Sequence, residues 1–405
     1  MSSSPDSASL NGTRCDVAII GGGIAGLAAA AYAAAAGHST VLLERFAFEN
    51  TMGGSGGLSR MFRVMYSDAP NAMLAETSLA LWQELEVATG QRVLDRTGLL
   101  FYGTDKGGAT VEGQLKQCAE TMTGLGIPYQ RLSREELLSS YPIFRTLPLD
   151  YYGLVQHNSA VIHANVAINA FQMRARAAGA QLFDNTPARV SPPSIPNGLY
   201  TVTTPGATFN ASRIIFCPGS WTNDAIRPMG LQVNLNIWVL SVAYWPIEPG
   251  ATWPMWYEFG PQISPTDPNA LNFYGFPPTD YPGMVKATAD FTNVTGTDPN
   301  TLDRNPDPRI LDQVGTFLTQ RFNGIAAVPQ DATTCLYAMS ADGEMILGTL
   351  GHWPRSAIFT GDSGRAFKFA PLLGRILVEF ATTGSTNYDI SPWAITPKRR
   401  IFSGS

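Results

Sequence analysis

The sequence contains few of the residues that build metal centres and disulfide frameworks. Its 405 residues include 4 cysteines and 4 histidines, and both kinds are dispersed along the chain. Scattered cysteines in a long chain are typical of a reducing compartment, so we expect a cytoplasmic protein without disulfide bonds. The same dispersion leaves no set of ligands at metal-binding spacing, and we expect no metal ion.

Charged residues are also scarce. Asp, Glu, Lys and Arg make up 15% of the chain, and the formal net charge is −5. This balance gives no basic field for nucleic acid or for an anionic membrane surface, so we expect neither partner. Residues 17–37 form an apolar run as long as a membrane span, but its alanines and its glycine pattern indicate another role. Residues 1–13 are polar, and we expect a disordered leader there.

A glycine pattern near the N-terminus predicts a dinucleotide site. The sequence CDVAIIGGGIAGLAAAAYAAAAGHSTVLLER indicates a strand over 16–20, a glycine turn, a helix over 24–36 and a strand over 40–43. G-x-G-x-x-G spacing permits a tight turn, close approach of the backbone to a pyrophosphate, and a helix N-terminus that faces the phosphates. An acid at the end of the second strand is placed to accept from ribose hydroxyls. The expected cofactor-binding residues of this unit are Gly21, Gly23, Ile24, Ala25, Gly26, Glu44 and Arg45.

The residues that follow favour FAD over NAD. A second glycine-rich loop, GGSGG at 53–57, comes before two arginines. An NAD dehydrogenase would normally continue into another helix and strand, whereas a loop of glycine and serine suits backbone wrapping along an extended FAD. We therefore expect Gly54, Ser55 and Ser59 to contact FAD as well.

Two interleaved domains are expected, because the chain is longer than a single core usually supports. Nucleotide-type segments at 14–90, 153–226 and 335–392 predict a Rossmann-type FAD-binding domain, and 91–152 with 227–334 predict a mainly antiparallel substrate domain. The fold class is therefore α/β. Helices are expected over 71–89, 107–122, 161–178 and 308–322, with a last one that ends at Gly384.

The sequence resembles the flavin amine oxidases typified by monomeric sarcosine oxidase and N-methyltryptophan oxidase. The resemblance covers nearly the whole chain, through the glycine fingerprint, GGSGGLSRMFR, FYGFP, CLYAMSADGEMILG and SGRAFKFAPLLGRILVEFATTGSTNYDIS. Within this family, NFYGF, FKF and YDIS are similar to segments of the nikkomycin-pathway oxidase that converts a cyclic imino acid to picolinate. The resemblance implies a fold like that of glutathione reductase and D-amino-acid oxidase.

Cys335 acquires a function through this resemblance. Taken alone, a cysteine in an apolar run is ordinarily a small core residue. Family members attach FAD by a thioether from its 8α-methyl group to a cysteine, and Cys335 stands at that position. The bond needs a thiolate, and a free cysteine with a pKa of about 8.5 then needs positive charge nearby. The resemblance implies covalent FAD at Cys335 and further cofactor contacts at Gly361, Gly364, Ala366, Phe367 and Lys368.

The resemblance also assigns the substrate side. Arg63 and Lys368 correspond to the arginine and lysine that bind the substrate carboxylate, which implies an amino or imino acid. Arg60 corresponds to a residue beside the flavin ring. Lys286 matches the lysine that promotes reaction of reduced FAD with oxygen, because a fixed cation stabilises the developing negative charge.

Several residues depart from the pattern of sarcosine oxidase. Asp290 replaces a family histidine, Gly56 replaces another, and Arg365 stands where relatives have a histidine or an aromatic residue. Arg96 replaces an acid of the picolinate-forming enzyme. Sarcosine itself is therefore not the expected substrate. Asp290 is a candidate proton acceptor, and the aromatic candidates for the pocket are Tyr274, Tyr337 and Trp256.

The expected reaction is oxidation of a C–N bond in a secondary, cyclic or N-alkyl amino acid, in secondary metabolism. Hydride equivalents pass to FAD, an imine forms, and oxygen is reduced to hydrogen peroxide. An aromatising oxidase remains an alternative on the substrate. A flavin monooxygenase is a rival because TGDSG at 360–364 resembles the Gly-Asp turn of aromatic hydroxylases. A catalytically dead binding module is a further alternative, and we expect a monomer.

Overall fold

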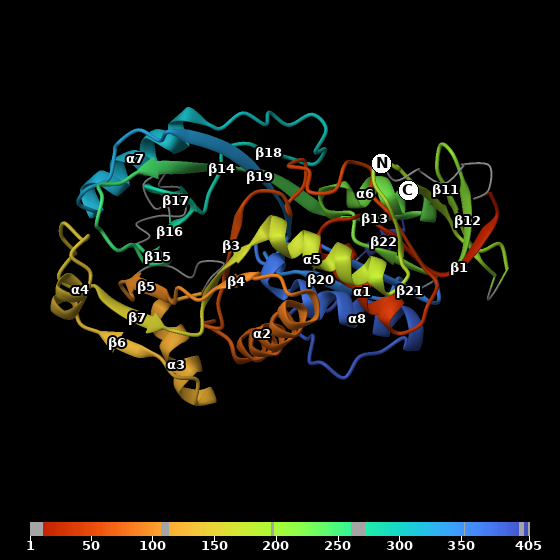
Figure 1. Cartoon of the computed structure of the whole chain (residues 1–405), viewed down its shortest axis with the longest axis horizontal. Helices are drawn as coiled ribbons and strands as arrows, with labels where there is room; N and C mark the ends of the chain where they lie inside the picture. Colours follow the sequence, from red (N-terminus) through yellow and green to blue (C-terminus); the bar gives the residue numbers. More distant parts are fainter. Residues whose placement is uncertain are drawn as a thin grey trace.

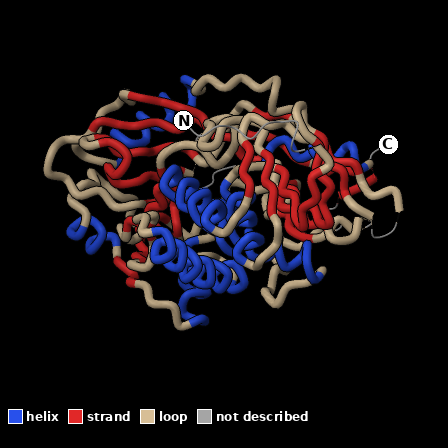
Figure 2. Tube along the Cα trace, turned by 45° about the vertical axis from the view of Figure 1, so that its right-hand side comes forward, coloured by secondary structure: helices blue, strands red, loops and turns tan. Residues whose placement is uncertain are grey.

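Two large sheets organise the computed structural model, which describes residues 11–106, 113–195, 198–260, 272–351, 353–396 and 401–403. The sheets lie toward opposite ends of the long axis, and the long helices gather between them (Figures 1 and 2). This arrangement confirms the predicted α/β fold with one largely antiparallel sheet. The boundaries proposed for the two domains stay a prediction, and most of the expected leader lies outside the described residues.

The N-terminal unit forms as the sequence predicts. It consists of β1 (Thr13–Ile20), α1 (Ile24–Ala35) and β2 (Thr40–Leu43), with β1 and β2 parallel. β1 starts three residues before the predicted strand because its first residues pair with β12 (Thr208–Phe216). A Cβ atom at Gly26 would lie 1.9 Å from the carbonyl oxygen of Gly21, so only glycine permits this approach of helix to strand.

In the described ranges, the first sheet has eight strands. Its parallel part runs in the order β21, β12, β1, β2, β9, while β20 pairs antiparallel with β21, and β10 and β11 extend the edge beside β12. Parallel strands with buried faces need helices for cover. The remaining bounds are β9 (Gln181–Phe183), β10 (Arg189–Ser191), β11 (Tyr200–Thr203), β20 (Ile346–Gly348) and β21 (Ser356–Thr360).

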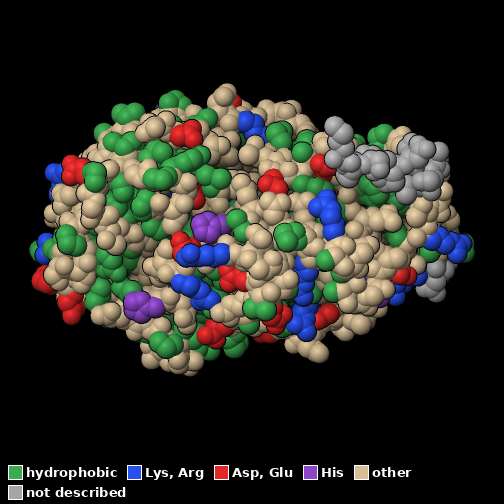
Figure 3. Space-filling view, in the orientation of Figure 1, with side chains coloured by type: hydrophobic (Ala, Val, Ile, Leu, Met, Phe, Trp, Pro, Cys, Tyr) green, Lys and Arg blue, Asp and Glu red, His purple; other side chains and the backbone are tan. Residues whose placement is uncertain are grey.

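Four helices form the layer that covers one face of this sheet. α1 packs between α5 (Ala164–Ala177) and α8 (Ala370–Thr383), and α2 (Ala69–Thr89) lies against α8. The alanines of α1 are buried except for Ala35, so the apolar run belongs to the core up to residue 34. Among the described helices, none combines the length and apolarity that crossing a membrane takes. Lys/Arg and Asp/Glu side chains are interspersed on the face in Figure 3.

The second sheet has nine strands among the residues that the structure describes, and these are antiparallel except where β15 runs parallel to β5. β19, which carries Cys335, pairs along its whole length with β14, so the segment that begins at residue 335 contributes its first strand to this sheet. The bounds are β5 (Leu99–Gly103), β6 (Gln130–Leu132), β7 (Tyr152–Gln156), β14 (Leu235–Pro246), β15 (Trp256–Phe259), β16 (Phe273–Tyr281), β17 (Met284–Ala289), β18 (Thr295–Gly296) and β19 (Asp331–Ser340).

Smaller elements connect the two sheets, and two predicted helices change their starts. Residues predicted to begin the helix at 161–178 form β8 (Ala160–His163), because they pair with β3 (Ser59–Phe62) and β4 (Leu94–Asp95). Residues 107–112 lie outside the described ranges, and α3 starts at residue 115. The other bounds are α3 (Leu115–Leu125), α4 (Arg134–Ser140), η2 (Gly219–Trp221), α6 (Thr222–Ile226), η3 (Arg227–Met229), β13 (Leu231–Val233), α7 (Pro308–Arg321), η4 (Ala366–Phe369) and β22 (Ile401–Ser403).

A buried ion pair fixes the second sheet to the helix beside it. Arg321, the last residue of α7, donates from Nε and Nη2 to the carboxylate of Glu258 on β15, at 2.8 and 2.7 Å. Tyr151 donates its hydroxyl to the same carboxylate at 2.8 Å. The Glu258 side chain is 4% exposed, so removing its charge leaves a cation with no counter-charge in a dry site.

Glu258→Gln is therefore expected to lower the free energy of unfolding by about 3–5 kcal/mol. The matched control is Glu120→Gln, whose exposed pair with Lys116 should change that energy by about 0.5 kcal/mol or less. Urea denaturation followed by circular dichroism measures both changes. Equal effects of the two substitutions would contradict the role of the buried pair.

Candidate functional site

Two adjoining cavities meet at the border between the sheets. The long cavity follows the first sheet from the β1–α1 turn, and the inner cavity lies over the second sheet. They share the lining residues Gly53, Arg60, Tyr337, Gly364 and Phe367. A ligand that fills the long cavity therefore reaches the inner one.

The long cavity opens on the start of α1. Gly23 at the N-cap offers no side chain, and the Ile24 N–H donates to Ser55 Oγ at 3.1 Å. The Glu44 carboxylate at the end of β2 accepts the N–H groups of Gly22 and Phe46 at 2.6 and 2.9 Å. Burial raises the pKa of Glu44 above its usual range. This wall presents helix-start N–H groups and one acid to the cavity, the donors and acceptor that suit a pyrophosphate and a ribose.

Glycines shape the rest of this wall, and the shape fits an FAD. A Cβ atom at Gly54 would meet the Leu336 carbonyl oxygen at 2.8 Å, and one at Gly364 would meet the Tyr337 ring at 2.5 Å. The absence of a side chain at these two positions lets the backbone of the cavity wall pack directly on β19. The predicted residues that line the long cavity are Gly21, Gly23, Ile24, Ala25, Glu44, Arg45, Gly54, Ser55, Gly364, Ala366 and Phe367.

Two predicted cofactor residues lie behind the lining. Gly26 supports the helix contact described above. Gly361 (φ +60°) packs against Ile346, and the cavity is lined instead by the neighbouring Asp362. The Asp362 carboxylate accepts the N–H groups of Ala338 and Gly364 at 3.1 and 3.0 Å, while burial raises its pKa to about 6.

Cys335 lies at the junction of the two cavities and is surrounded by cations. Its sulfur is 3.6 Å from Nη2 of Arg60. Burial raises the pKa of the thiol, while Arg60, Lys286 and Arg304 oppose that rise. Positive charge of the kind that stabilises a thiolate is thus present, although burial has the larger effect on the thiol.

Arg60 fixes the glycine loop beside that cysteine. Its Nη2 donates to the carbonyl oxygens of Gly54, at 2.8 Å, and of Gly56, and its Nη1 donates to that of Ser59 at 2.9 Å. The guanidinium carbon lies 5.4 Å from the centre of the Phe367 ring. The loop, β3 and η4 therefore meet at one cation.

Lys286 on β17 is buried beside the same junction. Its ammonium donates to the Ser59 carbonyl oxygen at 2.8 Å and lies 4.1 Å from the centre of the Phe276 ring. Burial lowers the pKa of Lys286 to about 8. A fixed cation is thus held at the inner cavity in a site where burial weakens its hold on a proton.

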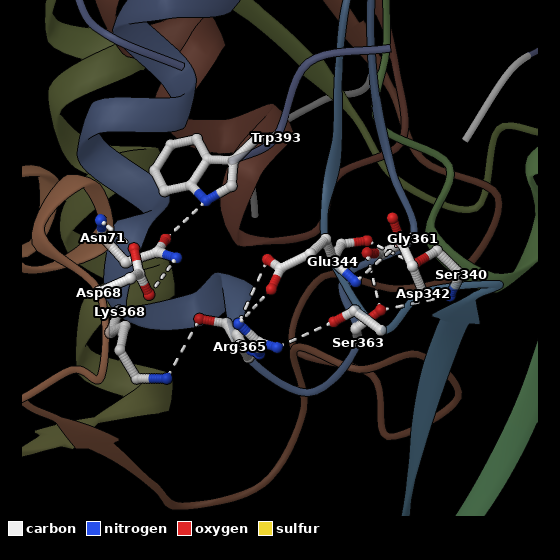
Figure 4. Close-up of polar contacts among 11 residues, drawn as sticks. Asp68, Asn71, Ser340, Asp342, Glu344, Gly361, Ser363, Arg365, Lys368 and Trp393 are labelled. Carbon is white, nitrogen blue, oxygen red and sulfur yellow. Dashed lines mark hydrogen bonds and ion pairs between the residues drawn. The ribbon is translucent and has the colours of Figure 1, made fainter. Parts of the chain in front are cut away.

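The inner cavity brings together Arg63, Lys368 and Asp290. Arg63 lies over the Tyr66 ring at 3.9 Å and donates from Nη1 to the Met65 carbonyl oxygen. Lys368 donates to the Arg365 carbonyl oxygen at 3.2 Å (Figure 4). Burial, with Arg63 nearby, holds the pKa of Lys368 well below its usual range.

Phenol groups complete this end of the cavity. Tyr257 donates to Oδ2 of Asp290 at 3.2 Å, and burial raises the pKa of Asp290 despite that bond. The hydroxyls of Tyr274 and Tyr337 are 3.2 Å apart, and the rings of Tyr257 and Tyr274 are nearly parallel at 6.2 Å. The cavity end is therefore flat-walled and aromatic, with two cations and one acid.

Two predicted substrate residues do not line either cavity. Trp256 packs against Phe322 at 5.1 Å on the opposite face of β15, and because side chains alternate along a strand, Tyr257 faces the cavity instead. Arg365 turns away to Glu344, with 3.0 Å between Nη1 and the carboxylate (Figure 4). Arg96, a position at which the sequence departs from the relatives, is exposed.

The other residues predicted for the flavin ring and the substrate line one cavity, and four further lining or neighbouring groups were not predicted from the sequence. The inner cavity collects Ser59, Arg60, Arg63, Tyr274, Lys286, Asp290, Cys335, Tyr337 and Lys368. Side chains alternate along the strand WYEF, so the sequence could have predicted that Tyr257 and Trp256 face opposite sides. No local pattern marks Asp280, Trp221 or Arg304. Within the described ranges, no three His, Cys, Asp or Glu side chains gather as a metal site.

Known proteins resemble this chain over almost its full length. The profile of the FAD dependent oxidoreductase family matches residues 16–380. Peroxisomal sarcosine oxidase of Homo sapiens is 28% identical, with 94% of this chain and 95% of that protein covered. Monomeric sarcosine oxidase of Bacillus sp. (strain NS-129) is 26% identical, with 95% and 97% covered. The structure of NikD, an amino acid oxidase essential for nikkomycin biosynthesis, is 30% identical, with a TM-score of 0.85 and coverage of 97% and 100%.

Gly26→Ala is expected to weaken FAD binding about ten- to a hundredfold, because relief of the clash with the Gly21 carbonyl costs about 1–3 kcal/mol at the cofactor wall. FAD titration of the apoprotein, in a Cys335→Ser background that prevents any thioether, measures the dissociation constant. Gly124→Ala is the control, since that exposed helical glycine has no atom near its Cβ position. Equal affinity in both variants would contradict the proposed wall.

Proposed function

This chain belongs to the FAD dependent oxidoreductase family, and from that premise we propose that it oxidises the C–N bond of a secondary, cyclic or N-alkyl amino acid. The observation that carries the proposal is the convergence of Arg63, Lys368 and Asp290 at the aromatic end of the inner cavity. The relatives named sarcosine oxidase and amino acid oxidase support the same substrate class.

The two cations suit a substrate carboxylate. Charge-assisted hydrogen bonds contribute about 1.5–3 kcal/mol each, and the buried positions of Arg63 and Lys368 keep water away from them. An arriving carboxylate also favours the ammonium form of Lys368, which burial and Arg63 otherwise disfavour. An amine without a carboxylate cannot make these contacts.

The acid suits the other end of an amino acid. Asp290 faces the same space, and with a raised pKa it is suited to orient an N–H group or to accept a proton from it. Tyr274 and Tyr337 offer hydroxyls and flat rings beside it. Bound FAD supplies the two-electron acceptor for the oxidation. The product is then an imine.

Oxygen is the proposed final acceptor, with hydrogen peroxide as its product. Lys286 supports this step because a fixed cation at the junction stabilises negative charge that develops on oxygen. We also propose that FAD is attached to Cys335, whose sulfur lies at the same junction. The likeness to NikD supports a role in secondary metabolism. A monomeric state and a cytoplasmic location stay predictions from the sequence.

Acid precipitation tests the attachment. The wild-type pellet is expected to be yellow, and the Cys335→Ser pellet colourless, because only a thioether retains flavin in the unfolded chain. Cys217→Ser, a buried cysteine at the long cavity, is the control and should leave the pellet yellow. A colourless wild-type pellet would remove Cys335 from the proposed chemistry.

Substrate recognition is tested by peroxide release without NADPH over proline, pipecolate, piperideine carboxylate and N-methyl amino acids. Arg63→Met is expected to lower kcat/KM for the best carboxylated substrate by about ten- to a hundredfold, the loss of one charge-assisted contact. Arg96→Met, which removes an exposed arginine, should leave kcat/KM unchanged. If no carboxylated amine supports turnover, the proposed clamp is wrong. Turnover that requires NADPH would favour a monooxygenase.

A further inference from the structure

Asp280 reaches the inner-cavity lysine through an irregularity between two strands. β16 and β17 pair regularly up to Phe276 opposite Lys286, and pairing resumes only with Tyr281 opposite Met284. Four residues of β16 therefore stand opposite one residue of β17. These extra residues form a bulge that brings the Asp280 carboxylate back over the sheet. The Asp280 side chain is 3% exposed.

A chain of hydrogen bonds joins this carboxylate to the ammonium. Ser59 donates its hydroxyl to Oδ2 of Asp280 at 2.7 Å and accepts a hydrogen bond from Nζ of Lys286. Tyr244 donates to the same Oδ2 at 3.0 Å. Nζ of Lys286 lies 3.8 Å from that oxygen. The other oxygen, Oδ1, is buried with no hydrogen-bond partner in the described part of the chain.

We propose that Asp280 is a positioning residue that keeps Lys286 in its ammonium form and aims it, through Ser59, at the place where oxygen reacts. The inference rests on the proposed oxidase function and on the role given there to Lys286. It adds a residue from the irregular part of a hairpin to a site otherwise built from the strands, the glycine loop and η4.

Among the charged groups around Lys286, Asp280 contributes most to keeping the lysine protonated. The groups that face Lys286 are Asp280 and the Phe276 ring from β16, Ser59 and Arg60 from β3, Tyr244 from β14 and Cys335 from β19. Arg60 and burial disfavour the ammonium, and Asp280 and a Cys335 thiolate favour it. A thioether at Cys335 carries no charge, so attachment of the cofactor leaves Asp280 as the anion that opposes burial.

The rate at which reduced enzyme reacts with oxygen should depend on the protonation of Lys286. An ammonium is present below its pKa, so the reaction of reduced enzyme with oxygen should slow as pH rises through about 8, the pKa of Lys286. Asp280→Asn keeps the shape and the hydrogen-bond acceptor but removes the charge. We expect the midpoint to fall by about one pH unit or more, which lowers the rate constant at pH 8 about fivefold.

Two readouts test the inference in the flavin-loaded protein. Stopped-flow mixing of reduced enzyme with oxygen gives the rate constant against pH, and anaerobic reduction by substrate should change less than about twofold. NMR titration of lysine labelled at Cε gives the pKa of Lys286 independently of turnover, with the resonance assigned by its absence in Lys286→Met. The chain has five lysines, so the spectrum is simple.

Matched variants separate the possible causes. Asp280→Glu keeps the charge and should keep the wild-type midpoint, and Tyr244→Phe, which removes a neutral donor to Asp280, should move it little. In a Lys286→Met background, Asp280→Asn should have no further effect on the oxygen rate. An additional loss in that background, or an unchanged Lys286 midpoint in Asp280→Asn, overturns the inference and leaves the oxidase proposal standing. If Lys286→Met itself reacts with oxygen at the wild-type rate, the proposed role of Lys286 is wrong, and the inference about Asp280 that rests on it is wrong as well.

Discussion

Arg60 connects three parts of the site that are far apart in the chain. Its guanidinium donates to the carbonyl oxygens of the loop at 53–57, lies 3.6 Å from the sulfur of Cys335 on β19, and lies over Phe367 of η4. The loop follows the first sheet, β19 belongs to the second, and η4 precedes the last helix. The meeting of the long and inner cavities therefore depends on this cation, because moving any one segment breaks its contacts with the others.

The cations of the inner cavity are held in a common way. Arg60, Arg63, Lys286 and Lys368 each donate to backbone carbonyl oxygens, and Lys286 also has the Asp280 carboxylate at 3.8 Å. A carbonyl satisfies a donor without cancelling its charge, so the positive potential stays available for an anionic ligand. Buried charges of this kind disfavour folding unless an opposite charge compensates them. The same burial lowers the pKa values of Lys286 and Lys368. The site is thus organised for charge that arrives with a ligand.

The sequence predicted the parts of this site that depend on local geometry. The β1–α1 turn follows from glycine spacing, and the predicted helix over 24–36 is found as α1 over Ile24–Ala35. Predictions that depended on tertiary pairing were weaker. β8 replaced the start of a predicted helix because β3 lies beside it, and Arg365 turned to Glu344, a partner 21 residues away. Asp280 was missed because its position depends on an irregular strand pairing that no residue pattern announces.

The pairing of β19 with β14 means that the proposed thioether would anchor the flavin to the middle of the second sheet. Ten consecutive residue pairs join these strands, from Leu235 with Ser340 to Tyr244 with Asp331, and Cys335 is near the middle of that ladder. The other end of the long cavity is the start of α1 on the first sheet. A flavin bonded at Cys335 and seated against α1 would link the second sheet to the first, by a covalent bond at one end and by non-covalent contacts at the other. Separating the two sheets would then require the cofactor to leave its contacts with the start of α1.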